Sequence, residues 1–271
     1  MSGFPVDPYF VTESDAPPVI VLAGSEDRER GSDPHRHRRG QLFGSTRGLL
    51  TIGLDMGVWV VPATHAVWVP PHQLHWARSH GPFSGFAVYV AQDTCADLPA
   101  GPCSIRVSGL LREAVLRAAT WPPGELDARG ERIATVILDE IRTLPVDALG
   151  LPLPRDARLL RIARAILDEP ADERSLEAWA AWAAISARSL SRHFVVETGF
   201  TFTVWRQRAR LLRALEMLAD AVPVTTIALD LGYSTPSTFI SLFKRTFGAT
   251  PAAYRQRLQG PADLSNPAES A

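Results

Sequence analysis

The residues best able to do chemistry stand together in "DPHRHRRGQLFG", from Asp33 to Gly44, where two histidines and three arginines occupy five consecutive positions. Four interpretations fit such a cluster: a nucleic-acid patch, a metal site, the lip of a ligand pocket or a solvated loop. In an extended strand, residues of equal parity share a face. We therefore expect one shared polar face from His35, His37, Arg39 and Gln41.

The distribution of charge argues against the nucleic-acid interpretation. The segment from Arg155 to Leu258 holds 15 Lys+Arg against 10 Asp+Glu, a net +5, and the rest of the chain holds 13 against 19, a net −6. Such an asymmetry suggests that the basic segment meets a polyanion. The histidine cluster lies in the acidic remainder, so the nucleic-acid interpretation loses weight against the other three.

Composition excludes several classes of protein. With 271 residues, 46% hydrophobic and 21% charged, the chain is long enough for two globular domains. It has no run of 18 uncharged apolar residues, and "MSGFPVDPYF" is not a signal peptide, so we expect a cytoplasmic protein with no membrane partner. Cys95 and Cys103 fit no common zinc pattern and are expected to be reduced thiols.

The first part of the chain has the pattern of an all-β domain. Short runs with alternating polarity, "GLLTIGLD", "GVWVVPA", "HAVWVPP" and "FSGFAVYV", are separated by Gly or Pro every 8–12 residues. This spacing is typical of a sandwich or barrel. The period then becomes helical over 108–121, with Ser108 as N-cap, and over 125–144.

A Pro-rich linker, "PVDALGLPLPRD", separates this part from a helical second half. That half contains a repeat at an offset of 49 residues: "LSRHFVVETGFTFTVWRQR" from Leu190 aligns with "FISLFKRTFGATPAAYRQR" from Phe239. Two copies of so short a unit predict a tandem module, because a solenoid needs at least three.

Each copy has the pattern of a helix-turn-helix. In the second copy, residues 225–231 predict a short helix that Gly232 ends in a left-handed conformation. Thr235 then caps a new helix with Pro236 at its first position, and Ser186 is the corresponding cap in the first copy. Because an α-helix fits the DNA major groove, two such helices about 34 Å apart could enter successive grooves.

The helical half closely resembles the AraC family of transcription regulators. The resemblance covers about 100 residues and rests on "IALDLGYSTPSTFISLFKRTFGATPAAYR", with "SLEAWAAWAAISARSLSRHFVVETGFTFTVWRQRARL" as the first motif. The chain departs from the family at Ala184, where a turn glycine is usual, so we expect a slightly different first turn. The family implies base contacts from Arg188, Ser191, Arg192, Ser237, Thr238 and Ser241, and phosphate contacts from Lys244 and Arg245.

The first half is similar to a cupin, a small metal-binding barrel with the motifs H-x-H-x3–4-E and P-x-G-x2-H. His35 and His37 match the first motif, where Gln41 replaces the glutamate. In "PPHQLH", His72 replaces the glycine and His75 takes the position of the final histidine. The resemblance implies a divalent transition metal held by His35, His37, Gln41 and His75.

An organic effector without metal is the competing interpretation, and the lost carboxylate gives it more weight. Trp59, Trp68, Phe86 and Tyr89 are candidates for the walls of such an effector pocket, although core packing explains each of them equally well. Many AraC-like regulators carry a barrel of this kind as their sensor, with helices such as those over 108–144 used for dimerisation.

The expected fold is therefore multidomain: an N-terminal all-β cupin-like barrel followed by helices, and a C-terminal all-α tandem helix-turn-helix domain. We place the barrel at 1–105, a helical dimerisation region at 106–145, a linker at 146–156, the DNA-binding domain at 157–260 and a disordered tail at 261–271.

We expect a transcription regulator, activator or repressor, that responds to a small molecule or metal and is not an enzyme. Its expected partners are double-stranded DNA, an effector, a second copy of the chain and RNA polymerase. A metal-dependent cupin enzyme fused to a helical domain is the alternative, and a DNA-binding architectural protein without ligand is a third possibility. Against the enzyme, the first motif lacks a carboxylate and the sequence offers no other catalytic constellation.

Overall fold

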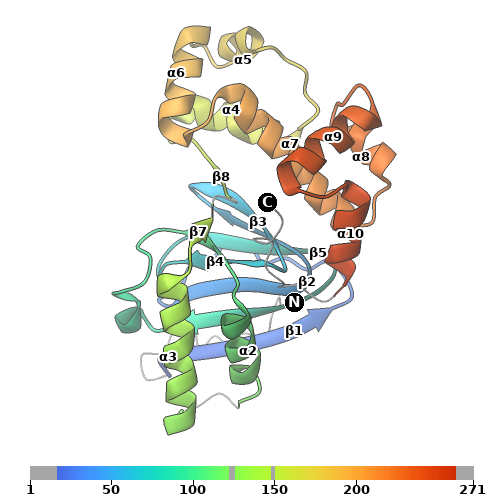
Figure 1. The fold of residues 1–271 in the computed structure, drawn as a ribbon. Coiled ribbons are helices and arrows are strands. Elements are labelled where there is room, and N and C mark those ends of the chain that lie inside the picture. Colours follow the sequence, from blue (N-terminus) through green and yellow to red (C-terminus); the bar gives the residue numbers. More distant parts are fainter. Residues whose placement is uncertain (1–16, 122–125, 148–149, 261–271) are drawn as a thin grey trace. The chain divides into compact units, whose positions relative to one another are not determined.

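The computed structural model describes residues 17–121, 126–147 and 150–260, and the chain forms two compact units (Figure 1). The first unit comprises Met1–Leu54, Trp59–Gly150 and Arg257–Ala271, and the second comprises Asp55–Val58 and Leu151–Gln256. The tail predicted at 261–271 lies outside the described residues. None of the helices in the described ranges is long and apolar enough to cross a membrane.

The first unit is built on most of an eight-stranded sheet. Its order is β1-β5-β2-β4-β6-β7, and β3 pairs with both β2 and β8. The paired strands between β1 and β7 run antiparallel. The strands are β1 (Val19–Glu26), β2 (Gly40–Leu54), β3 (Gly57–Pro62), β4 (His65–Val69), β5 (His75–Val90), β6 (Cys103–Arg106), β7 (Val146–Asp147) and β8 (Gly150–Pro152).

The four predicted strand runs are confirmed as parts of β2, β3, β4 and β5. Two of these strands are longer than the sequence indicates, since β2 has 15 residues and β5 has 16. The strands β1 and β6 are not among the predicted runs, because β1 begins as an unbroken apolar run and β6 has only four residues. The segment predicted as a linker contains β7 and β8.

The sheet bends strongly along β2 and β5. Register shifts interrupt their pairing on both sides of Arg47, and Gly48 takes a left-handed φ of 80° there. A side chain at Gly48 would lie 2.6 Å from the Pro82 carbonyl oxygen, so only glycine fits this corner. Such bulges bend strands. An apolar core lies on each side of the bent sheet.

The two faces of the sheet bury different residues. One face packs against helices α2 (Gly109–Ala118) and α3 (Ala128–Thr143) and includes Leu42, Trp68, Phe86 and Val88. The inner side of the bend buries Phe43, Ile52, Trp59, Val67 and Phe83. A short 3₁₀ helix, η1 (Gln92–Cys95), follows β5. The predicted N-cap of α2 is confirmed, because the Ser108 hydroxyl accepts from the Leu111 amide at 2.9 Å.

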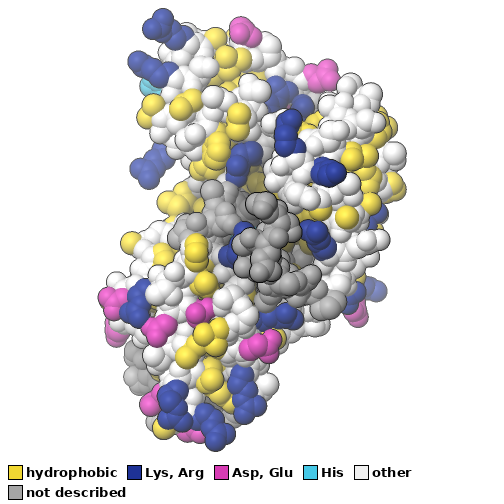
Figure 2. Space-filling model, in the orientation of Figure 1, with side chains coloured by type: hydrophobic (Ala, Val, Ile, Leu, Met, Phe, Trp, Pro, Cys, Tyr) yellow, Lys and Arg dark blue, Asp and Glu magenta, His cyan; other side chains and the backbone are white. Residues whose placement is uncertain are grey.

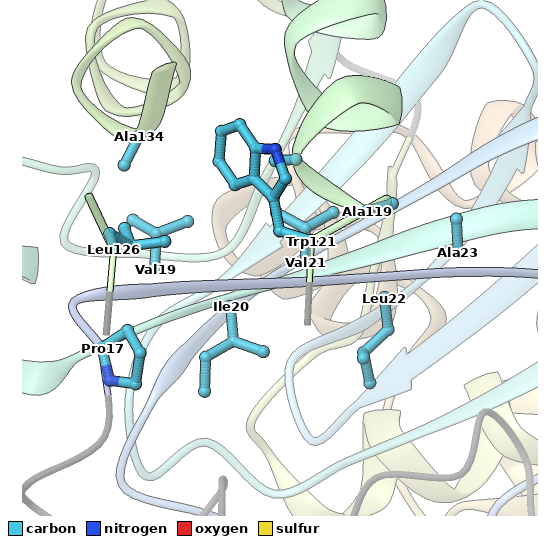
Figure 3. Close-up of a pocket in the computed structure, with 11 residues that line it drawn as sticks. Pro17, Val19, Ile20, Val21, Leu22, Ala23, Ala119, Trp121, Leu126 and Ala134 are labelled. Atoms are coloured by element: carbon cyan, nitrogen blue, oxygen red, sulfur yellow. The ribbon is translucent and has the colours of Figure 1, made fainter. Parts of the chain in front are cut away.

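An apolar cavity of about 130 Å³ lies beside β1, below the ends of α2 and α3 (Figure 3). Trp121 points toward it from the residues that follow α2, and the other lining side chains are aliphatic or prolyl. They are Pro17, Val19, Ile20, Val21, Leu22, Ala23, Ala118, Ala119, Leu126 and Ala134. None of the aromatic residues predicted to line an effector pocket belongs to this lining.

The second unit is helical. Its helices are α4 (Ala157–Asp168), α5 (Leu176–Trp182), α6 (Ala187–Thr198), α7 (Phe202–Ala219), α8 (Val224–Asp230), α9 (Pro236–Phe247) and α10 (Pro251–Gln259), the last of which ends beyond the unit. Both predicted caps are confirmed, since Ser186 accepts from the Ser189 amide and Thr235 from the Thr238 amide. Figure 2 shows Lys and Arg side chains gathered over the edge that α6 occupies in Figure 1.

The two copies of the repeat have the same local structure. Gly199 and Gly248 end α6 and α9 with φ of 75° and 72°, and each amide donates to a carbonyl four residues earlier. In the preceding turns, Gly232 has φ of 74° and Ala184 has φ of 53°. The expectation of a different first turn is therefore wrong, because Ala184 adopts the left-handed conformation that the glycine has in the second copy.

Candidate ligand site and nucleic-acid interface

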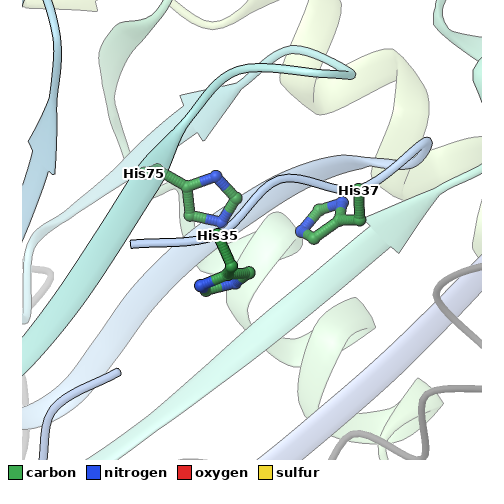
Figure 4. A group of neighbouring side chains, drawn as sticks. All are labelled: His35, His37 and His75. Atoms are coloured by element: carbon green, nitrogen blue, oxygen red, sulfur yellow. The ribbon is translucent and has the colours of Figure 1, made fainter. Parts of the chain in front are cut away.

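Three histidines from two separate stretches of the sequence meet in the first unit (Figure 4). His35 forms an isolated β-bridge with His75, the first residue of β5, and His37 lies two positions further along the same segment. One ring nitrogen from each histidine lies within 4.8 Å of the others. His37 and His75 are buried and His35 is exposed, so the cluster has one solvent-facing side.

Gln41 joins this cluster because the sheet bends. In the pairing of β2 with β5, Gln41 is opposite Tyr89 at one end and Leu54 is opposite His75 at the other. Straight strands of this length would span about 50 Å. The Gln41 Oε1 atom nevertheless lies 2.9 Å from His37 Nε2 and 3.2 Å from His75 Nε2. The bend thus brings both ends of β5 to one site.

The prediction of a strand through His35 and Arg39 is wrong, because β2 begins only at Gly40. The segment is held by separate bonds instead, including a reciprocal pair between the His35 and His75 backbones at 2.9 Å. Without a regular pleat, parity does not apply there. Arg39 donates to the Pro17 carbonyl at 2.7 Å rather than facing the histidine rings.

Each of the three imidazoles is oriented by a main-chain carbonyl two residues away. The Nδ1 atoms of His35, His37 and His75 lie 2.8 Å from the carbonyl oxygens of Asp33, Arg39 and Gln73. Carbonyl oxygens only accept hydrogen bonds, so each Nδ1 carries the hydrogen and each neutral ring presents a lone pair at Nε2. Metal-binding histidines are oriented in this way.

Burial keeps two of these rings neutral. It lowers the pKa of His75 to about 4, and the backbone bond to Gln73 opposes this only in part. Burial also lowers the pKa of His37, against a raising effect of its bond to Gln41. With the Gln41 amide in this orientation, the Nε2 lone pairs of both neutral rings face its carbonyl oxygen, and no hydrogen lies between these acceptors. A cation placed there would attract all of them.

His72 occupies the glycine position of the cupin-like motif and has φ of 65°. A left-handed φ is uncommon outside glycine, although histidine is among the residues enriched there. The His72 ring lies outside the cluster, with Nε2 3.0 Å from the Gln92 Oε1 atom. His72 thus has a left-handed φ at a position where the cupin motif has glycine, as Ala184 has at the turn position of the first helix-turn-helix.

The four predicted pocket aromatics do not share one site. Tyr89 lies with the histidines, its ring centroid 5.6 Å from that of His37, and Gln41 is its side-chain partner. Trp59 belongs to the inner core, which reaches the cluster through Phe43, 5.6 Å from the His75 ring. Trp68 and Phe86 are on the opposite face, packed with α2 and α3.

All eight residues predicted to contact DNA have exposed side chains in the second unit. On α6, the Arg192 guanidinium lies 3.0 Å from the ring nitrogen of the adjacent His193. The buried side of the helix holds Leu190 and Phe194, so its basic face points away from the core. On α9, Thr238 also shares a 2.9 Å hydroxyl contact with the cap Thr235.

The two copies of the repeat differ at a pair of exposed positions outside the predicted site. By the repeat, Val195 and Val196 occupy the positions of Lys244 and Arg245. Their side chains are 41% and 79% exposed, so they are not core residues. The offset of 49 residues already contained this signal. The first copy therefore presents an apolar surface where the second presents two cations.

Comparison with known proteins identifies the family of the chain. A helix-turn-helix domain profile matches residues 179–257, and the profile of the AraC-like ligand binding domain matches residues 17–182. The HTH-type transcriptional regulator NimR of Escherichia coli is 30% identical over 239 residues, which cover 88% of this chain and 86% of NimR. This chain belongs to the AraC family of transcription regulators.

Other AraC-family relatives match over shorter stretches. The regulator RipA of Corynebacterium glutamicum is 33% identical over 135 residues, 50% of this chain and 39% of RipA. Among solved structures, ToxT from Vibrio cholerae aligns over 89% of this chain and 99% of its own, with a TM-score of 0.40 and 8% identity. The predicted two-part fold, with a sheet-rich ligand-binding domain before a helix-turn-helix region, is confirmed.

Membership of the AraC family decides between the function classes. The chain is a DNA-binding transcription regulator with a ligand-binding domain, and the alternative of a cupin enzyme is set aside, because its relatives are named regulators.

Proposed function

We propose that this regulator reads DNA by placing α6 and α9 in successive major grooves of one duplex. Arg188, Ser191 and Arg192 on α6 and Ser237, Thr238 and Ser241 on α9 would contact base edges. Their exposure on the face opposite each helix's core residues supports this assignment. Arginine is suited to bidentate contacts with guanine.

Lys244 and Arg245 are assigned to the phosphate backbone. They stand in the second half of α9 and are exposed. Recognition helices read bases mainly from their N-terminal residues, so these cations are better placed for phosphates. Such contacts add affinity without sequence preference.

Two substitutions test this division. Arg192→Ala should weaken binding to a DNA duplex selected from a random pool by about 1–3 kcal/mol, with little effect on unrelated duplexes. Lys244→Ala should weaken binding to all duplexes similarly and reduce the salt dependence by about one phosphate contact. Fluorescence anisotropy over a salt series measures both, and equal losses on selected and unrelated DNA for Arg192→Ala would contradict the base-reading role.

For the ligand-binding domain, the function supported best is the binding of a divalent transition metal by His35, His37, His75 and Gln41. The observation that carries this is that all three imidazoles are fixed through Nδ1, with the Nε2 atoms of His37 and His75 turned toward Gln41 Oε1. Three imidazole nitrogens and one amide oxygen suit zinc, copper, nickel or cobalt better than magnesium or calcium.

The donor atoms are near the separation that a metal requires. Tetrahedral zinc with Zn–N bonds of about 2.1 Å needs nitrogens roughly 3.4 Å apart, against the 4.8 Å span of this cluster. Metal binding would therefore draw the rings closer together. The metal would supply only a positive charge and directed bonds, and the chain's donors would fix its position.

An organic effector bound without metal is the second candidate. Turning the Gln41 amide by 180° would let its two hydrogens satisfy the Nε2 atoms of His37 and His75. The cluster would then be a finished polar wall beside Tyr89. In that case neutral hydrogen-bonding groups, rather than a metal ion, would recognise the effector.

Cobalt(II) titration distinguishes the two candidates. Metal binding through these donors should produce the visible absorption bands of a four- or five-coordinate cobalt site at about one equivalent. His35→Ala, at an exposed position, should abolish them without unfolding the chain. His72→Asn is the matched control, because position 72 lies outside the cluster and asparagine tolerates its left-handed φ. No visible bands in the unsubstituted chain would favour the organic effector.

The remaining partners belong to this proposal as well. A homodimer formed through α2 and α3, contact with RNA polymerase and a location in the cytoplasm all agree with DNA regulation. A bound ligand would change the affinity for DNA only if it binds one arrangement of the protein more tightly than another.

A further inference from the structure

Two arginines of α7 hold the loop that precedes the first helix-turn-helix. Arg206 and Arg210 are four residues apart, so they lie on one face of the helix. Arg206 donates to the carbonyl oxygens of Arg174, at 2.8 Å, and of Asp172. Arg210 donates to those of Pro170, at 2.7 Å, and of Asp172, at 3.4 Å. Three alternate carbonyls of one loop are thus bound by two guanidinium groups.

The same loop is also fixed from its own side. Arg174 forms an ion pair with the Asp172 carboxylate at 2.6 Å. Its guanidinium lies 3.6 Å from the Trp179 ring centroid, a side chain fully buried in α5. The Ser175 hydroxyl then caps α5 through the Ala178 amide. The loop is therefore continuous with the first helix of the first helix-turn-helix.

The second helix-turn-helix touches this loop at its turn. A Cβ atom at Gly232 would lie 3.2 Å from the Ala171 carbonyl oxygen and 3.5 Å from Arg210 Nη2. The Arg210 guanidinium is 5.9 Å from the Tyr233 ring centroid, and Tyr233 packs on Phe239 of α9 at 5.3 Å. One side chain therefore contacts both the loop of the first copy and the turn of the second.

We infer that Arg206 and Arg210 are positioning residues that fix the separation of α6 and α9, and so the spacing of the two DNA blocks that the chain reads. Long helix α7 joins the two copies, and Trp205 and Ala209 of α7 belong to the core of the first copy. The shared loop adds a connection between the copies through hydrogen bonds from charged donors, which are the strong ones. The inference rests on the proposal that both helices read one duplex.

The test uses a duplex selected from a random pool by the unsubstituted chain, and the same duplex with 5 base pairs inserted between its two blocks. The insertion turns the second block by about half a helical turn, so the unsubstituted chain should lose at least roughly tenfold in affinity. Arg210→Ala should bind the parent duplex about tenfold more weakly, and the insertion should cost it less than about threefold.

Two controls separate positioning from folding. A duplex with the first block alone should bind Arg210→Ala as tightly as the unsubstituted chain. Arg213→Ala removes an exposed arginine from the same helix, one paired with Glu216, and should keep the full insertion penalty. If Arg210→Ala fails to fold by circular dichroism, Arg210→Lys decides, since a lysine cannot span two carbonyls and should also reduce the penalty.

The outcomes are distinct. An unchanged insertion penalty in Arg210→Ala, or in Arg210→Lys where that variant decides, would overturn the inference alone. An unsubstituted chain that tolerates the insertion would overturn the two-groove proposal and this inference with it.

Discussion

At the scale of single residues, the histidine cluster combines well-oriented donors with little charge. His35, His37 and His75 are fixed through their Nδ1 atoms, and the fourth member, Gln41, is neutral. A divalent ion held there would keep its full charge. This combination predicts a site that is selective for transition metals but binds them less tightly than one with a carboxylate.

Gln41→Glu should therefore strengthen metal binding. A carboxylate near a divalent ion adds a charge attraction that an amide lacks, and we expect affinity for zinc to rise by at least about tenfold at pH 7.5. Competition with a chromophoric chelator measures the change. Gln92→Glu, a glutamine whose partner is His72 outside the cluster, is the matched control. Equal affinities of Gln41→Glu and the unsubstituted chain would contradict a metal at Gln41.

The sequence could predict which residues form the histidine cluster, but not the backbone path that brings them together. The match to two short motifs predicts that His35, His37, Gln41 and His75 form one site. The predicted strand through the first three residues is absent, because β2 begins only at Gly40. The alternation of side chains along β5 would have placed Phe86 and Tyr89 on opposite faces of the sheet, because their residue numbers differ by three. The meeting of both ends of β5 depends on the bend at Arg47 and Gly48, which no local pattern reveals.

At the scale of elements, the turns of the two helix-turn-helix units have the same backbone despite different residues. In the first unit, the Ile185 amide donates to Ala180 at 3.0 Å, and in the second the Tyr233 amide donates to Ala228 at 2.9 Å. Ala184 takes the left-handed φ between them. A non-glycine residue in this region is strained by roughly 1 kcal/mol.

Ala184→Gly should stabilise the second unit. The relief of strain exceeds the entropy that glycine adds to the unfolded chain by a small margin, so we expect a gain of up to about 1 kcal/mol. Ala183→Gly is the control, because Ala183 has an ordinary φ of −92° and should lose stability. Urea unfolding followed by circular dichroism measures both. A loss of stability in Ala184→Gly would contradict strain at this turn.

The helices of this unit were largely predictable from sequence. Ser186, Thr235 and Pro236 mark helix starts by their chemistry, and Gly232 marks a turn. The loop that Arg206 and Arg210 hold was not predictable, because its bonds go to backbone carbonyls more than 30 residues away. Backbone acceptors leave no mark in the residue types of the loop.

The valine pair of α6 yields a prediction from the repeat itself. Val196→Arg restores the residue type that Arg245 supplies in the second copy. If this face of α6 lies along the DNA backbone, affinity for unrelated duplexes should rise and the salt dependence should steepen by about one phosphate contact. Leu110→Arg, an exposed apolar position on α2, is the control. Identical salt slopes for both variants would contradict a DNA-facing Val196.

At the scale of the whole molecule, the chain joins a bent sheet with a histidine cluster to a duplicated helical unit with basic faces. The difference in charge between its parts, +5 and −6, anticipated this division. Composition cannot show how ligand and DNA are coupled. That coupling requires a difference in DNA affinity between the ligand-bound and ligand-free protein, and the effect must be reciprocal.

The most direct test is the affinity of the full chain for its selected duplex, measured by fluorescence anisotropy with excess zinc and with EDTA. A metal-responsive regulator predicts a change in Kd of about fivefold or more, in either direction, typical of allosteric coupling. The change should disappear in His35→Ala, which keeps the helical unit intact. An unsubstituted chain with the same Kd in zinc and in EDTA would contradict the account.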